Sequence, residues 1–191
     1  MMSSFLERVY DVLFQPRTAM RQIAAERPLG QAVVAVITSS VLPLWGLYLS
    51  GRTTIMGNKL GLLLAFELLT VFLLWFGKAA VLHLLTELCG GLGRVTGLLA
   101  ALGFATLPRL LIIPLAVLSM LLPEELQAAL LGLGVAIVVL WSVVLDILAL
   151  KGTYDITSAK AISILVAPYL AFLVIAGCVV TFLHAIVNLF V

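Results

Sequence analysis

Long apolar runs separated by short polar connections dominate the chain from residue 31 onward. A helix that crosses a bilayer needs about 20 mostly apolar residues. Five stretches reach that length, at about 31–50, 60–86, 97–122, 126–150 and 160–190. The pattern predicts an all-α integral membrane protein, built as a bundle of five transmembrane helices. Proline removes a backbone donor, so Pro108 and Pro168 are predicted to kink the third and fifth helices.

The first 30 residues carry an amphipathic pattern instead. Apolar residues recur at helical spacing over 5–13, Pro16 ends this helix, and a second short helix is predicted over 17–25. We interpret 1–30 as an N-terminal arm of amphipathic helices at the cytoplasmic interface, and 31–191 as the transmembrane domain. Whether the arm only anchors the first span or also docks a partner stays open. The apolar positions are Phe5, Leu6, Val9, Tyr10 and Leu13, then Met20, Ile23 and Ala24.

Composition supports the membrane assignment. Hydrophobic residues make up 63% of the 191 residues and charged residues only 10%, with a mean hydropathy of +1.25. Soluble domains carry about 25% charged residues, so this chain could not cover a water-facing surface. The net charge of +2 and the absence of a basic run exclude nucleic acid as a partner.

Signals for enzymatic or metal chemistry are weak. Cys89 and Cys178 lie in or beside apolar segments and far apart, as expected for small apolar residues in lipid. Neither His83 nor His184 has a partner at zinc-ligand spacing, and no Gly-x-Ser-x-Gly sequence is present. The sequence therefore predicts a protein that is not an enzyme and holds no metal or other cofactor.

The distribution of Lys and Arg predicts the orientation, because cytoplasmic connections carry the excess of these residues. Seven cations lie on the side of the N-terminus and two, Arg52 and Lys59, on the other side. We therefore expect a cytoplasmic N-terminus and an external C-terminus in the inner (plasma) membrane. The seven are Arg8, Arg17, Arg21, Arg27, Arg94, Lys151 and Lys160.

Four charged residues fall inside the predicted spans: Glu67, Lys78, Arg109 and Asp146. A central Arg or Lys costs roughly 2.5–3.5 kcal/mol on insertion scales. From the helical rise, Arg109 lies about 19 Å deep from the cytoplasmic side, close to the depth of Glu67. Lys78 and Asp146 both lie in the cytoplasmic half. We expect two ion pairs, Glu67 with Arg109 and Lys78 with Asp146, which either fix helix register or line a pathway.

Small residues predict close helix contacts and one tight turn. Gly90, Gly91 and Gly93 follow the second span and suit a compact cytoplasmic turn. Glycine and alanine also recur at four-residue spacing on spans three and four, from Gly97 and from Gly132. Such stripes fit packing within one chain or the interface of a homo-oligomer. The expected cytoplasmic contact surface comprises Arg17, Arg21, His83, Glu87, Gly90, Gly91, Gly93 and Arg94.

Four segments, in order, resemble the Yip family, whose name refers to interaction with Ypt/Rab GTPases. Residues 13–23, followed by Arg27-Pro28, resemble the arm before its first span. His83, leading to the glycines at 90–93, resembles its His-then-Gly-Gly turn. Residues 103–108, Gly-Phe-Ala-Thr-Leu-Pro, are similar to its Gly-Tyr-Ala-x-x-Pro motif, with Phe in place of Tyr. Residues 141–149 and 157–161 resemble its last connection.

The resemblance implies a five-helix bundle with a cytoplasmic N-terminus, and a prokaryotic, short-arm member of the family. In eukaryotic members it implies a trafficking role through small GTPases and membrane-shaping partners, which use a longer N-terminal region. We therefore expect a non-enzymatic membrane protein that organises partner proteins or lipids at its cytoplasmic face. The alternative is a small transporter or channel that uses the four intramembrane charges.

Overall fold

The computed structural model describes residues 4–49 and 60–190, with side chains described for 4–45 and 61–182. Within these ranges all regular structure is helical. The helices are α1 (Phe5–Phe14), α2 (Pro16–Glu26), α3 (Leu29–Leu49), α4 (Leu60–Leu88), α5 (Val95–Phe104), the 3-10 helix η2 (Leu107–Leu111), α6 (Ile112–Ser119), α7 (Glu124–Tyr154) and α8 (Ser158–Phe190).

Four helical stretches of the described chain are long and apolar enough to cross a membrane. They correspond to α4, to α5 through α6, to α7 and to α8; the apolar part of α3, Leu29–Trp45, is shorter. The prediction of an all-helical multi-pass membrane protein is therefore confirmed. The predicted first span reaches residue 50, which lies outside the described residues.

The predicted third span is not one continuous helix. α5 ends at Phe104, η2 begins at Leu107, and α6 completes the crossing. Pro108 stands at the start of η2, where its missing N–H and fixed φ suit a new helical turn but not the interior of an α-helix. At Pro108, where a kink was predicted, the structure has a 3-10 helix between two α-helices. Pro168 lies inside α8, which continues as a helix across it, and a kink there stays a prediction.

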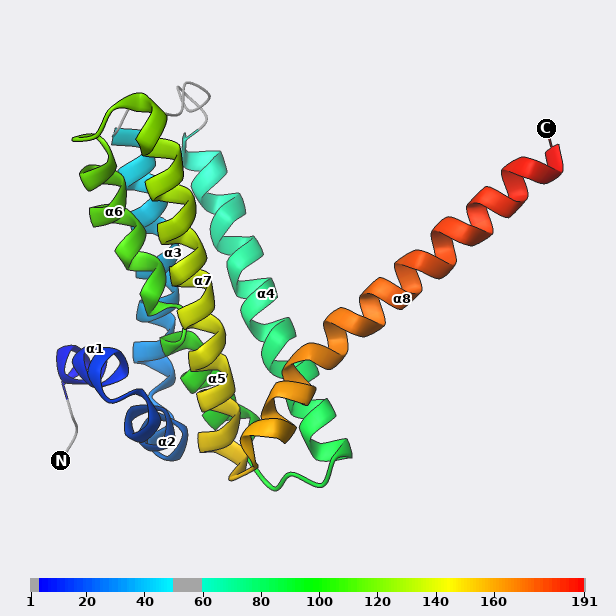
Figure 1. The fold of residues 1–191 in the computed structure, drawn as a ribbon. Helices are drawn as coiled ribbons and strands as arrows, with labels where there is room; N and C mark the ends of the chain where they lie inside the picture. The colour runs from blue at the N-terminus through cyan, green and yellow to red at the C-terminus, as the bar shows by residue number, and fades with distance from the viewer. Residues whose placement is uncertain (1–3, 50–59, 191) are drawn as a thin grey trace.

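The connections gather at two ends of the bundle (Figure 1). One end, which we call the arm end, carries α1, α2 and the connections 89–94 and 155–157. The opposite end carries the tight hairpin at 120–123, so we call it the hairpin end. α5 lies at the centre of the packing, in contact with α2, α3, α4 and α7.

The arm packs on the bundle rather than standing apart from it. α2 lies against α5 and α7, and glycines at both contacts let the backbones approach. A Cβ at Gly97 would meet the Ala24 carbonyl oxygen at 2.6 Å, and one at Gly152 would meet the Arg21 backbone at 3.0 Å. The predicted apolar side of α2 is confirmed, because Met20 and Ile23 are fully buried.

α1 is buried only on the side that faces the bundle. Val12, which the sequence pattern did not single out, is fully buried, and Arg8 is buried too. Arg8 donates hydrogen bonds to Glu26 of α2 and Gln31 of α3, so it ties three helices together. A separate stripe stays exposed, formed by Leu6, Tyr10 and Phe14.

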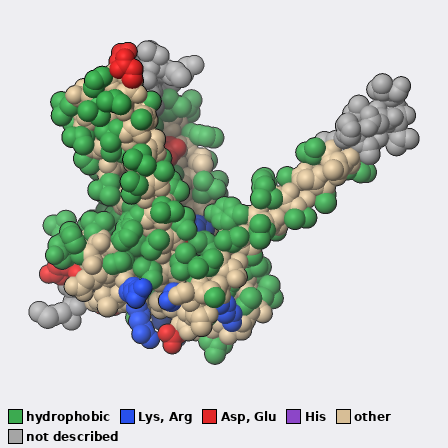
Figure 2. All heavy atoms as spheres, in the orientation of Figure 1, with side chains coloured by type: hydrophobic (Ala, Val, Ile, Leu, Met, Phe, Trp, Pro, Cys, Tyr) green, Lys and Arg blue, Asp and Glu red, His purple; other side chains and the backbone are tan. Residues whose placement is uncertain are grey.

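Apolar side chains cover most of the long part of the molecule (Figure 2). α8 contacts α4 and α7 near its start and then leaves the bundle (Figure 1). From Val166 to Phe182 most of its side chains are exposed, and they are largely apolar. An exposed apolar surface of this extent is the expected outer face of a protein that lies in lipid.

Candidate functional site

Two of the four intramembrane charges form the ion pair expected from the sequence. Lys78 Nζ of α4 lies 2.5 Å from Asp146 Oδ2 of α7. Asp146 is buried and Lys78 is partly buried. Both helices run from the hairpin end to the arm end, and both residues lie about two to three turns before the end of their helix. The two side chains therefore meet at one depth.

The second expected ion pair is absent. Among the described residues, neither Glu67 nor Arg109 lies within 4 Å of an opposite charge. Arg109 instead lines a pocket together with Lys78 and Asp146, and Glu67 does not line it. The prediction that Glu67 pairs with Arg109 is wrong.

The direction of the helices explains the failure. Long side chains on a helix lean toward its N-terminus. α4 begins at the hairpin end, so Glu67 leans toward that end. The α5–η2–α6 segment runs the other way, so Arg109 leans toward the arm end. Even at equal depth, long side chains on two opposed helices would therefore point apart.

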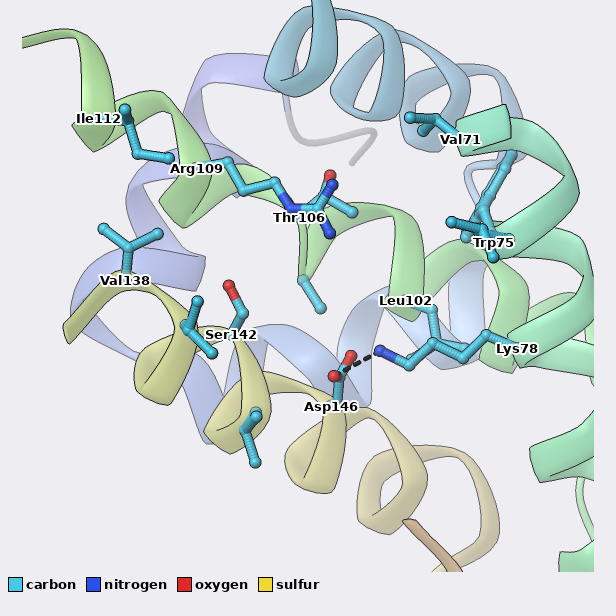
Figure 3. A pocket seen from close by; sticks show the side chains of 14 residues that line it. Val71, Trp75, Lys78, Leu102, Thr106, Arg109, Ile112, Val138, Ser142 and Asp146 are labelled. Carbon is cyan, nitrogen blue, oxygen red and sulfur yellow. Dashed lines mark hydrogen bonds and ion pairs between the residues drawn. The ribbon is translucent and has the colours of Figure 1, made fainter. Parts of the chain in front are cut away.

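The pocket has a volume of about 320 Å³ and is walled by α4, α7 and the α5–η2–α6 segment. This volume is at the lower end of the range of ~300–1,000 Å³ that is typical of ligand sites. Figure 3 shows the Arg109 side chain extending into the pocket, apart from the dashed contact between Lys78 and Asp146. The lining residues are Val71, Leu74, Trp75, Lys78, Leu102, Ala105, Thr106, Arg109, Ile112, Val138, Val139, Ser142, Val143 and Asp146.

Ser142 adds an unsatisfied hydroxyl to this pocket. Its Oγ is buried and has no hydrogen-bond partner among the described residues. Other hydroxyls in the spans donate to a carbonyl of the preceding turn, as Thr70 does to Phe66 and Ser119 to Ala116. The pocket therefore combines apolar walls with one ion pair, one further cation and an unused hydroxyl.

A second cluster forms at the arm end around Tyr154, which sequence reasoning missed. The Tyr154 hydroxyl lies 2.5 Å from His83 Nδ1, and His83 Nε2 lies 3.4 Å from Glu87 Oε1. A Cβ at Gly93 would come within 2.4 Å of the Tyr154 ring, and one at Gly91 within 3.3 Å. The glycine turn is therefore shaped by a buried aromatic ring.

The turn itself ends α4 in a standard way. Gly90 has a φ of +79°, a left-handed conformation that glycine adopts without strain. The Gly91 N–H donates to the Thr86 carbonyl, and the Gly90 N–H donates to that of Glu87. These two bonds form a Schellman motif. Of the expected contact surface, His83, Gly91 and Gly93 therefore face inward.

Three arginines meet at the surface of the arm end. Arg21 and Arg27 from the region of α2, and Arg94 before α5, line one recess of about 350 Å³. Arg27 Nε is buried and has no hydrogen-bond partner among the described residues. Arg21 contacts Asp155 at 3.4 Å, with both side chains largely exposed. Arg17 lies in a neighbouring recess that shares Arg21.

Two features of these sites could be anticipated only in part from the sequence. Ser142 was visible as a polar residue in the fourth span, but its unused hydroxyl depends on a rotamer. Arg27 was counted in the cytoplasmic charge, but its place in the recess depends on how α2 docks. A polar residue within a span, and a cation beside a helix end, are the signals that point to such positions.

Comparison with known proteins places the chain in a family. A search of curated proteins and a search of solved structures each found no match. The family model of the Yip1 domain matches residues 10–179, from α1 into α8. This range contains both the intramembrane pocket and the arginine recess. Because the match covers most of the 191 residues, the chain belongs to the Yip1-domain family.

Proposed function

We propose that the chain crosses the inner membrane five times, with its arm end in the cytoplasm. α3 supports a fifth crossing, because its 21 residues span about 32 Å at the usual helical rise. The hydrocarbon core of a bilayer is ~30 Å thick. All seven cations counted on the N-terminal side lie at the arm end, as the positive-inside rule requires of a cytoplasmic face.

In this orientation the protein acts without catalysis, as a membrane-embedded organiser of partner proteins or lipids at the cytoplasmic face. The observation that carries this function is the recess of Arg21, Arg27 and Arg94. Guanidinium groups bind carboxylates and phosphates through paired hydrogen bonds. Three of them around one recess favour an acidic ligand, either a protein segment or a lipid head group.

The arm is suited to hold this surface at the membrane. α2 is fixed to α5 and α7 by backbone contact at Gly97 and Gly152, so the arginines are presented on a rigid base. The exposed stripe of Leu6, Tyr10 and Phe14 on α1 offers an apolar face to the interface. Anionic lipids attract each nearby cation by about 1 kcal/mol.

A comparison of two groups of cations at the arm end tests the function. The triple variant Arg21→Gln, Arg27→Gln, Arg94→Gln removes the recess, and Lys151→Gln with Lys160→Gln removes cations whose ammonium groups contact Ser158 and the Cys89 carbonyl. After purification in mild detergent, co-purifying proteins and anionic lipids are quantified by mass spectrometry. We expect the triple variant to lose them and the double variant to keep them. Equal retention in both would refute the proposal.

One observation favours a second candidate function, a small transporter or channel. Lys78, Arg109 and Asp146 border a cavity and are not enclosed between helices alone. This candidate predicts a flux across liposomes that Arg109→Leu abolishes while the thermal stability of the protein stays unchanged. Glu67 is not part of this cavity, so Glu67→Gln should leave the flux intact.

A further inference from the structure

We propose that the intramembrane pocket binds the anionic head group of an amphiphile that enters sideways from the bilayer. Arg109 would hold the anionic oxygens, and Ser142 would donate a hydrogen bond to them. This site is separate from the arginine recess at the arm end, and it goes beyond the proposed function. Its ligand is defined by chemistry: a carboxylate or phosphate attached to a hydrocarbon chain.

The residues that line the pocket leave a net positive charge in it. Lys78 is neutralised by Asp146 at 2.5 Å, while the Arg109 side chain makes no ion pair or hydrogen bond with any described residue. With two cations and one carboxylate among its lining residues, the pocket has a formal charge of +1. An arginine cannot lose its proton in a protein. An unpaired guanidinium in the middle of a span therefore calls for an anion or for water.

Asp146, the carboxylate in the pocket, is already paired with Lys78, and no other described acidic side chain lines the pocket. The sequence contains no Asp or Glu after Asp155, so α8 brings no acidic side chain even if it closes onto the bundle. Glu124 and Glu125 lie in the first turn of α7 at the hairpin end. Glu67 does not line the pocket. A ligand from outside the chain is then the source of negative charge.

The polar groups of the pocket are arranged for a small anionic group. Ser142 Oγ is buried without a partner and can donate one hydrogen bond. Thr106, by contrast, already donates to the Gly103 carbonyl and accepts from Ser39. Figure 3 shows Arg109 and Ser142 entering from opposite walls of the pocket. An anion between them would contact a charged donor and a neutral donor.

The rest of the pocket is suited to a hydrocarbon chain. Leu74 on α4 is 66% exposed and Val139 on α7 is 56% exposed, and both line the pocket. In a bilayer these exposed side chains face lipid, so the pocket opens between α4 and α7 toward the acyl chains. A free inorganic anion cannot bury apolar surface against these side chains. An amphiphile can pack its hydrocarbon chain against them and place its charge at Arg109.

Binding to the full chain in detergent micelles tests the proposal. The probes are a long-chain fatty acid, a monoacyl phosphate, the methyl ester of the fatty acid, and inorganic phosphate. We expect one or both acidic amphiphiles to bind, the ester to bind at least about tenfold more weakly, and inorganic phosphate not to bind. One lost charged hydrogen bond of ~1.5–3 kcal/mol corresponds to a loss of about tenfold or more.

Variants locate the site. Arg109→Gln should weaken the acidic amphiphile by about tenfold or more, and Ser142→Ala should weaken it by a smaller factor. Glu67→Gln, a charge change at similar depth outside the pocket, should leave binding unchanged. If Arg109→Gln fails to fold, the proposal is tested by comparing the binding of the fatty acid with that of its methyl ester to the wild-type protein. Equal binding of acid and ester, unaltered binding by Arg109→Gln, or binding of inorganic phosphate alone would each overturn the proposal.

Discussion

Lys78 and Asp146 are 68 positions apart in the sequence, yet their side chains meet inside the bundle. A paired charge in a membrane interior costs far less than a lone one, because the partner replaces lost hydration. Arg109 lies beside this pair without joining it in the described structure. At the scale of single residues, the described lining of this pocket therefore contains one ion pair and one cation without a counter-ion.

The ion pair leads to a stability prediction. Asp146→Asn leaves Lys78 charged without its counter-ion and should lower the free energy of unfolding by about 3–5 kcal/mol, as for other broken buried pairs. Replacing both residues, with Lys78→Met and Asp146→Leu, should restore most of the loss. Thermal unfolding in detergent measures both variants. If the double variant is as unstable as the single one, the unpaired charge of Lys78 is not the cause of the lost stability.

The glycine turn leads to a second prediction at this scale. Gly93→Ala would place a Cβ within 2.4 Å of the Tyr154 ring and 2.8 Å of the Thr153 carbonyl oxygen. Overpacking of this kind costs typically about 1–3 kcal/mol, and a shifted Tyr154 would lose its contact with His83. Gly132→Ala is the control, because nothing lies within 4 Å of that position. Thermal unfolding should show destabilisation in the first variant alone.

At the scale of elements, the arm is part of the fold. α2 contacts α7 and α5 directly, and Arg8 joins α1 to α2 and α3 through Glu26 and Gln31. The arm is therefore packed onto the bundle, and docking of a partner by the arm stays a prediction. Its inner face fixes the helix ends, while its outer face presents cations and an apolar stripe.

The arm should be sensitive to acid. The hydrogen bond from Gln22 and the nearby Arg8 hold the pKa of Glu26 below its ordinary value. A carboxyl with a lowered pKa in the folded state stabilises that state above its unfolded pKa, which is about 4.3 for Glu. This stabilisation is lost as the pH falls through the folded pKa.

Glu26→Gln measures this contribution. Its melting temperature should lie below that of the wild type near neutral pH, and the gap should close below about pH 4. A gap of constant size across this range would show that the charge of Glu26 does not secure the arm.

At the scale of the whole molecule, the two ends of the bundle differ in chemistry. The arm end carries cations and folded connections, and the hairpin end of α7 carries Glu124 and Glu125. Figure 2 shows Lys and Arg side chains gathered at the arm end, with apolar side chains over the long part of the bundle. This asymmetry supports one orientation in the membrane.

The two cysteines can test that orientation. Cys89 is exposed at the arm end, and Cys178 is exposed on α8 among apolar residues. A membrane-impermeant maleimide should label Cys89 in inverted vesicles but not in intact cells. Labelling should persist in Cys178→Ala and disappear in Cys89→Ala. Labelling of Cys89 from outside intact cells would reverse the proposed topology.

The sequence by itself determined the class of the protein, the approximate positions of the helices, the apolar side of α2 and the pairing of Lys78 with Asp146. These follow from local properties, namely apolar run length, helical periodicity and rise per residue. These local properties were also sufficient to predict the ion pair of Lys78 and Asp146, because the two residues lie on helices that run in the same direction.

Only the tertiary structure decided which charges meet. Glu67 and Arg109 lie on helices that run in opposite directions, and Glu67 does not line the pocket that Arg109 enters. The recess at Arg27 and the ring contact of Tyr154 with Gly93 depend on how α2 and the glycine turn dock onto α7. Depth is a one-dimensional quantity that a sequence encodes, whereas side-chain direction and helix docking are properties of three-dimensional packing.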